Sequence, residues 1–192
     1  VITHATQRTF ELIRTKAEAG DGFFQKIYGH AFNAGPLAQG DWATAFDWLT
    51  RSASNGYPRG QRLLAEVYDT AKGAPRNRVL AVEWYGRAAR QGSFESSYRL
   101  AIMHYYGVGI PVSKTSARRW LETIPSEQRA PKVIFLLALM HARGEGGFRQ
   151  NYGAAATLYR QAARDGYSVA QQNLANLYRR GLGVSRDICE AL

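Results

Sequence analysis

The sequence predicts an all-α fold, a right-handed α/α superhelical solenoid built from stacked helical hairpins. Three observations predict it. One pattern of alanines, glycines and large aromatic residues recurs along the chain at a spacing of about 36 residues. Within each copy the apolar residues follow the period of an α-helix, and glycines punctuate each copy at fixed positions. A unit of this length cannot bury its apolar faces alone, so copies are expected to stack into one continuous core.

The repeat is clearest between residues 60–92 and residues 97–124. The same residues recur 36 positions apart, with Leu64 matching Leu100, Ala65 matching Ala101, Gly73 matching Gly109, Pro75 matching Pro111, Ala81 matching Ala117 and Trp84 matching Trp120. Downstream copies keep this register with two single-residue insertions, one near "PSEQRAP" and one near Gly147. Agreement at this many positions predicts a true internal repeat.

The copies account for nearly the whole chain, so residues 1–192 are predicted to form a single repeat domain. It would hold a leading half-repeat at 9–20, complete repeats at 24–56, 60–92, 96–130 and 133–166, and a truncated repeat at 170–192. In the copy at 96–130 "ETIPSEQRAP" replaces the usual ending, so stacking there is expected to be irregular. The chain begins at Val1 and stops within a helical pattern at "DICEAL", which indicates a processed protein or a piece of a longer one.

Each copy is predicted to contain two amphipathic helices. The apolar stripe of the first helix is illustrated by Gly60, Leu64, Ala65 and Tyr68, and that of the second by Ala81, Trp84, Tyr85, Ala88 and Ala89. Small residues allow close packing within a pair, while tryptophan and tyrosine fill the space between pairs. A Gly-x-Gly sequence is expected to end the first helix, and Gly56, Gly92 and Gly166 the second, because a left-handed cap favours glycine.

This arrangement of residues resembles the Sel1-like repeat family, helical-hairpin solenoids related to tetratricopeptide repeats. The resemblance covers about residues 9–192. It implies an adaptor that acts through protein contacts, most often bacterial and often in the periplasm or cell envelope, although a cytoplasmic location is also compatible. Family roles include secretion, exopolysaccharide assembly and immunity against phospholipase-like type VI effectors. The single cysteine, Cys189, excludes the disulfide-stapled branch of the family.

Composition narrows the choice of partners. The apolar run "VIFLLALM" at 133–140 is too short to span a membrane, and one cysteine cannot form a disulfide framework. The net charge is +10, from 20 arginines and 5 lysines against 15 acidic residues, which suits an acidic protein, nucleic acid or an anionic surface. The arginines are spread evenly along the chain, which favours the alternative that they form solvated helix faces.

The sequence motifs do not point to catalysis, a metal or a cofactor. Gly107-Val-Gly109, Gly144-Glu-Gly146 and Gly181-Leu-Gly183 lack the third glycine and preceding strand of a dinucleotide fingerprint, so we interpret them as turns. His104 and His141 share one repeat position, where other copies carry Phe32, Tyr68 and Tyr178. Two histidines make a poor metal site, and an aromatic-like packing role is the favoured interpretation.

A binding surface is predicted on the first helices, which line the concave side of such solenoids. Their non-core positions are polar in the outer copies but apolar and aromatic in the two middle copies. This apolar stretch is either the floor of a groove or core buried by tight curling. The predicted partner-binding residues are Arg62, Tyr98, Arg99, Ile102, Tyr105, Phe135, Leu139, Arg143, Arg179 and Arg180.

These features together predict a non-enzymatic scaffold that holds another protein, with an acidic surface or segment, in its concave groove. The alternatives are an immunity protein that neutralises a secreted effector, and a binder of an anionic polymer such as a polysaccharide or, less in keeping with the scattered arginines, nucleic acid. A polymer binder would gather its arginines on one face and lose affinity steeply with added salt.

Overall fold

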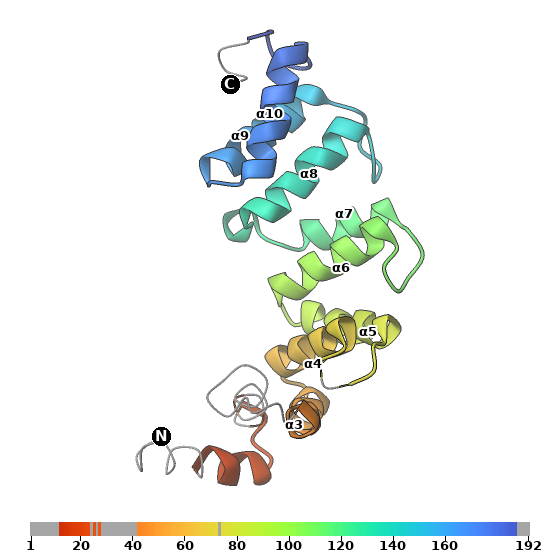
Figure 1. The fold of residues 1–192 in the computed structure, drawn as a ribbon, viewed down its shortest axis with the longest axis vertical. Helices are drawn as coiled ribbons and strands as arrows, with labels where there is room; N and C mark the ends of the chain where they lie inside the picture. The colour runs from red at the N-terminus through yellow and green to blue at the C-terminus, as the bar shows by residue number, and fades with distance from the viewer. Residues whose placement is uncertain (1–11, 24, 26, 28–41, 73, 188–192) are drawn as a thin grey trace. The chain divides into compact units, whose positions relative to one another are not determined.

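A computed structural model describes residues 12–23, 25, 27, 42–72 and 74–187, and every regular element in these ranges is helical (Figure 1). The predictions that concern His4, His30, Gly73 and Cys189 lie outside the described residues. The chain divides into two compact units, which are described separately. Unit 1 comprises residues 1–100 and 108–110, and unit 2 comprises residues 101–107 and 111–192.

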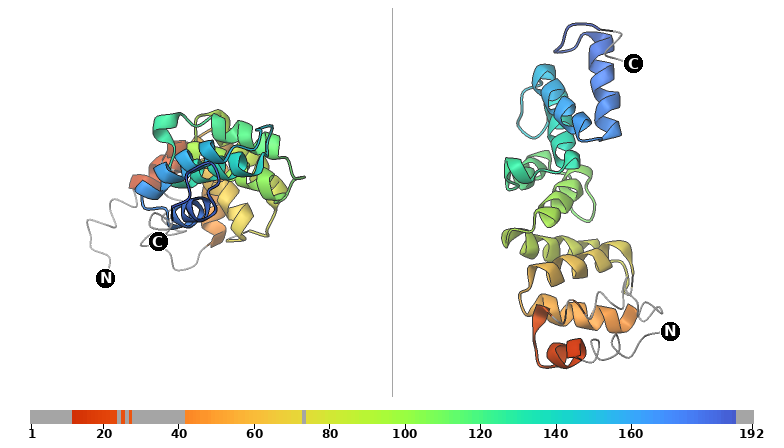
Figure 2. Two further views of the ribbon diagram at one scale, coloured as in Figure 1. Left: turned by 90° about the horizontal axis from the view of Figure 1, so that it is seen from above. Right: turned by 90° about the vertical axis from the view of Figure 1, so that its left-hand side faces the viewer.

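Unit 1 contains a helical segment at residues 12–18 and the helices α3 (Trp42–Ser54), α4 (Pro58–Thr70) and α5 (Arg78–Arg90). It also contains the first part of α6 (Phe94–Tyr106). Helix α4 packs against both α3 and α5 (Figure 2). The pair α4–α5 is the helical hairpin that the sequence predicts at residues 60–92.

Unit 2 contains the end of α6, then α7 (Lys114–Glu122), the short 3-10 helix η1 (Ser126–Gln128), α8 (Pro131–Arg143), α9 (Tyr152–Arg164) and α10 (Ser168–Arg180). Helix α9 packs against both α8 and α10. Helix α7 has 9 residues where α9 has 13, because the irregular "ETIPSEQRAP" sequence ends it early. None of the helices in the described ranges is long and apolar enough to cross a bilayer.

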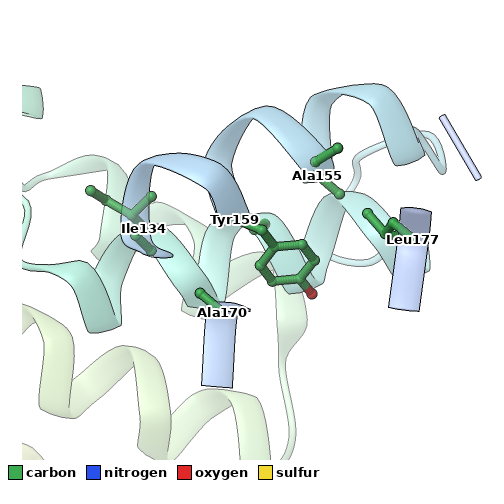
Figure 3. Packing of buried hydrophobic residues seen from close by; sticks show 8 residues of the cluster. Ile134, Ala155, Tyr159, Ala170 and Leu177 are labelled. Atoms are coloured by element: carbon green, nitrogen blue, oxygen red, sulfur yellow. The ribbon is translucent and has the colours of Figure 1, made fainter. Parts of the chain in front are cut away.

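The core of unit 2 forms where α8, α9 and α10 meet (Figure 3). Ala155 is fully buried and lets the helices approach closely, while the large ring of Tyr159 fills the space between Ile134, Ala170 and Leu177. In unit 1 the equivalent positions Ala81 and Tyr85 are likewise buried. The predicted pairing of small and aromatic residues on the second helix is therefore the packing rule in both units.

The tryptophan of the second helix is less buried than the sequence suggests. Trp84 on α5 packs at the edge of the α3–α4 core but stays half-exposed, and the guanidinium of Arg87 lies 4.3 Å from its ring centroid. Arg51 covers Trp48 on α3 in the same way, at 4.9 Å. Each arginine shields apolar ring surface and keeps its own charge in water, which is a favourable cation–π arrangement.

The turn between the two helices of a hairpin is held by a recurring N-cap. The side chains of Asn77, Ser113 and Asn151 each accept a hydrogen bond from the backbone N–H three residues later, at 2.8–3.2 Å. The N–H of each cap residue donates, at 2.9 Å, to a carbonyl near the end of the preceding first helix, that of Tyr68, His104 and His141 respectively. Each cap therefore starts one helix and closes the turn from the helix before it.

The first position of the Gly-x-Gly turn ends the first helix in the left-handed conformation. Gly144 and Gly181 cap α8 and α10 with φ values of 68° and 65°. In α4 the same position is Ala71, which keeps a φ of 60° despite its Cβ. The turn predicted from the glycines is confirmed, and unit 1 builds it with one strained alanine.

The second glycine of the turn lies against the start of the second helix of the preceding hairpin. A Cβ added to Gly146 would lie 2.9 Å from the backbone oxygen of Lys114, the first residue of α7. Gly109 meets the backbone of Arg78 and Gly183 that of Tyr152, which begin α5 and α9. Two hairpins can approach this closely only where the side chain is absent.

A glutamine side chain, buried in unit 1 and exposed in unit 2, also links successive hairpins, and the sequence pattern did not reveal it. The Nε2 groups of Gln25, Gln61 and Gln171 donate to the backbone oxygens of Ala17, Ala53 and Ala163 at the end of the preceding second helix. Each of these helix-end carbonyls also accepts the backbone N–H three residues later, from Gly20, Gly56 and Gly166 respectively, so the glutamine is a second donor to it. In the copies between them the position holds Ser97 and Ile134, so the link is not continuous along the chain.

Candidate functional site

The predicted partner-binding residues are divided between the two units. Unit 1 holds Arg62, Tyr98 and Arg99, and unit 2 holds Ile102, Tyr105, Phe135, Leu139, Arg143, Arg179 and Arg180. Since the units are described separately, each group is considered on its own. The residues of the two units differ in how deeply they are buried and in how many of their arginines form ion pairs with carboxylates.

The two predicted arginines of unit 1 are each paired with a glutamate on the same helix. Arg62 lies 3.3 Å from Glu66, and Arg99 lies 3.8 Å from Glu95. Such i,i+4 pairs on a helix surface contribute only a few tenths of a kcal/mol, so a partner could replace them at small cost. Tyr98 directly precedes Arg99 in the sequence. Its side chain is half-buried, and the residue already takes part in an interaction within the protein.

Tyr105 does not have the place predicted for it. Its side chain is 1% exposed, so it cannot contact a partner directly. Its hydroxyl donates to Glu145 at 2.5 Å and accepts from Arg143 at 3.2 Å, while the ammonium of Lys114 lies 3.2 Å from the ring centroid. Burial, together with the carboxylate of Glu145, raises the pKa of Tyr105 and keeps its hydroxyl protonated as a donor. Tyr105 thus anchors the turn after α8.

Phe135 lies at the edge of the α8–α10 core. Its ring centroid is 5.6 Å from that of Tyr159 and 5.3 Å from that of Tyr167, in tilted arrangements that favour aromatic pairs. Ile102 and Leu139 are half-buried. The sequence left two interpretations of this apolar stretch, a groove floor or buried core. The second applies to Tyr105 and, for most of its side chain, to Phe135.

The predicted arginines of unit 2 are exposed. Arg143 ends α8 and Arg180 ends α10, at equivalent positions of two successive hairpins. Arg143 donates to Tyr105, and Arg179 donates to the side-chain oxygen of Asn176 at 3.2 Å. None of the three forms an ion pair with a carboxylate of the described residues. Their positive charge is therefore available at the surface.

His141 packs against an aromatic residue, and His104 is partly buried. His141 stacks on Phe148 with ring centroids 3.9 Å apart, and Arg118 covers the ring of Phe148 at 3.9 Å. Burial, and then the charge of Arg118, lowers the pKa of His141, and burial lowers the pKa of His104. Both rings are thus held neutral near pH 7. In the described part of the chain, no three His, Cys, Asp or Glu residues come together as a metal site would require.

These lowered pKa values predict that unit 2 is less stable in mild acid. Protonation of either histidine is easier in the unfolded chain, so stability is complete above the ordinary pKa of 6.5 and falls as the pH drops below it. Each histidine can add at most about 1.4 kcal/mol per pH unit to this slope. Urea unfolding between pH 7.5 and 5.5 measures it.

The matched control replaces both histidines with tyrosine, the residue that the repeat carries at Tyr68 and Tyr178. The variant H104Y/H141Y should unfold with nearly the same free energy across this pH range. Parallel pH profiles for the wild-type protein and the variant would contradict the assignment.

A groove in unit 1 was not predicted from the sequence. It has a volume of about 790 Å³ and lies at the turns that join one hairpin to the next. Its lining includes three aromatic side chains, two arginines and one amide, namely Phe23, Tyr57, Phe94, Arg59, Arg62 and Gln91. The signal that could have revealed it is an aromatic residue within three positions of Gly20, Gly56 and Gly92 in three successive copies.

The helices, caps and glycine turns define the protein as an α-helical repeat protein whose hairpins stack through glycine contacts and small-residue helix faces. Sel1 repeats match at residues 37–57, 58–93, 95–123, 131–167 and 168–192, and the chain belongs to the Sel1 repeat family.

The chain is similar to a solved structure with this fold and to two curated relatives. The crystal structure of c5321, described as a protective antigen of uropathogenic Escherichia coli with an SLR fold, superposes with a TM-score of 0.86 at 29% identity, over 92% of this chain and 38% of that one. An uncharacterised protein of Neisseria meningitidis is 29% identical over 183 residues, or 78% of this chain and 39% of the relative. Chitin synthase regulatory factor 3 of Schizosaccharomyces pombe is 26% identical over 151 residues, 74% of this chain and 16% of its own. The chain thus spans well under half the length of these relatives.

Proposed function

We propose that the protein is a non-enzymatic adaptor that binds a partner protein through an acidic surface or segment of that partner. The observation that carries the proposal is the set of exposed arginines without carboxylate partners at the ends of the first helices of unit 2. Arginine presents a planar fork that binds carboxylates through two parallel hydrogen bonds. An acidic partner would supply the countercharge.

The position of these arginines supports a specific surface. Arg143 and Arg180 recur at the last residue of α8 and α10, so two successive hairpins present the same cation. A cation in the last turn also stabilises the helix by about 0.3–1 kcal/mol, through its interaction with the helix dipole. Arg119 and Arg164 lie in the last turns of α7 and α9 and make the same favourable interaction with a helix dipole. They lie outside the proposed surface, so they serve as a matched control.

The contact set that we propose keeps most of the residues predicted from the sequence. Ile102, Leu139, Arg143, Arg179 and Arg180 contribute from unit 2, and Arg62, Tyr98 and Arg99 from unit 1. Tyr105 and Phe135 support this surface through packing. Changing Phe135 to aspartate would place a carboxylate against Tyr159 and Tyr167, so it is a poor test of binding.

The relatives support an interaction role. Sel1 repeats are a scaffold of stacked hairpins that offers extended surfaces, and one relative is named a chitin synthase regulatory factor. The net charge of +10 fits an acidic partner.

The test is affinity capture from an extract of the source organism, followed by mass spectrometry and reconstitution with the purified partner. The variant R143E/R180E should retain at least about tenfold less partner than the wild type, because it replaces attraction with repulsion at two sites. The variant R119E/R164E changes the net charge equally and also removes cations from last helical turns, but it should capture as the wild type does. Thermal unfolding confirms that both variants fold.

Equal losses in the two variants would mean that only the overall charge matters, and would overturn the proposal of a specific acidic surface. Competition by unrelated polyanions, with binding that collapses steeply as salt is added, would favour the anionic-polymer alternative.

A further inference from the structure

The groove of unit 1 has the chemistry of a peptide-binding site. Its aromatic side chains are more exposed than the core of the same unit, with Phe23 48%, Tyr57 39% and Phe94 36% exposed. Single exposed aromatics are ordinary, but three that line one groove of about 790 Å³ form an apolar surface of the kind that anchors a partner side chain.

The charges around these rings select the occupant. Arg62 is paired with Glu66, and Glu95 is paired with Arg99. Arg59 is exposed, and among the described residues its guanidinium has no ion-pair or hydrogen-bond partner. The unmatched charge in the groove is therefore one positive charge beside an apolar floor.

The polar lining also suits an extended backbone. The Nε2 group of Gln91 donates to Gln61, which leaves the side-chain oxygen of Gln91 to accept a backbone N–H at the groove wall. Gly92 follows directly, so the wall carries no side chain at that point. A peptide segment can approach the chain closely here.

We infer that this groove binds an extended segment of the partner protein in which an aspartate or glutamate stands beside an aromatic or large aliphatic residue. The carboxylate pairs with Arg59, and the apolar side chain packs among Phe23, Tyr57 and Phe94. This inference rests on the proposed adaptor function and assigns its recognition element to unit 1.

The repeat supplies substitutions that the fold already tolerates. Position 59 corresponds to Glu95 one copy later, so R59E introduces the residue of a neighbouring repeat. Position 94 corresponds to Ser168, the first residue of α10 two copies later, so F94S introduces a residue that the repeat also carries at this position. R90E is the matched control, because Arg90 is an exposed arginine in unit 1 that does not line the groove.

The experiment is selection of a random nonapeptide library displayed on phage against the full chain, followed by fluorescence-anisotropy titration of the selected peptides. We expect selected peptides to combine an acidic with an aromatic or large aliphatic residue. Their affinity should fall at least about tenfold with R59E, with F94S, and when the acid is changed to its amide, and should be unchanged with R90E.

Failure to select peptides, or selected peptides that bind R59E and F94S as tightly as the wild type, would overturn the inference. Peptides without an acidic residue would also overturn it. A native partner that is still captured through Arg143 and Arg180 would then show that the adaptor function stands while the groove assignment fails. If the protein captured no specific partner, the adaptor function would be contradicted. The peptide titrations would still show whether the groove binds acidic, apolar peptides.

Discussion

Replacing Tyr159 with alanine should lower the free energy of unfolding by about 3–5 kcal/mol, because it removes a large ring from a packed core. Tyr159 is 2% exposed and joins α8, α9 and α10 in unit 2. Its fully buried neighbours include five alanines, whose short side chains cannot move in to fill the cavity. The loss should appear as a lower midpoint in urea unfolding followed by circular dichroism.

The matched control is Tyr106→Ala, because Tyr106 is the same residue type in unit 2 but is 61% exposed. It should cost less than about 1 kcal/mol. If both substitutions destabilised the protein equally, the tyrosine on the second helix would not be the residue that holds the three helices together.

The second large effect is expected for Gly146→Ala, at about 2–4 kcal/mol. Gly146 has a φ of 68°, a region that disfavours a Cβ. The added atom would also lie 2.9 Å from the backbone oxygen of Lys114, which a side-chain rotation cannot relieve. Unit 2 should therefore lose stability through both the turn and the contact between hairpins.

The neighbouring glycine separates these two causes. Gly147 has a φ of 86°, but an added Cβ would meet only the flexible end of Arg118 at 3.7 Å. Gly147→Ala should thus cost only about 1–2 kcal/mol for the backbone conformation. Equal costs at both glycines, measured by the same urea titration, would show that close approach of the hairpins contributes nothing.

The fold could be predicted because its determinants recur. Ala155 and Tyr159 repeat Ala81 and Tyr85, so one hairpin's apolar stripe predicts the next. The glycine turns were predictable for the same reason. Ala71 departs from this rule, since a residue without glycine's freedom occupies the left-handed position where the closure of the turn requires it.

The candidate site was harder to predict, because a helical period identifies an apolar face but not the element that covers it. Tyr105 has the spacing of a surface residue, yet Glu145 and Arg143, about 40 positions later, bury and bind its hydroxyl. The groove at Phe23, Tyr57 and Phe94 depends on three turns that come together only in the folded chain. A sequence pattern shows neither which distant residues Tyr105 contacts nor which aromatic side chains stay exposed.

The adaptor function is tested most directly by isothermal titration of the purified protein with its purified partner at about 150 mM salt, where nonspecific ionic binding weakens. We predict a complex of one partner per chain, with an affinity that falls at least about tenfold in R143E/R180E and stays unchanged in R119E/R164E. Binding without fixed stoichiometry, or equal displacement by unrelated polyanions, would contradict the proposed function.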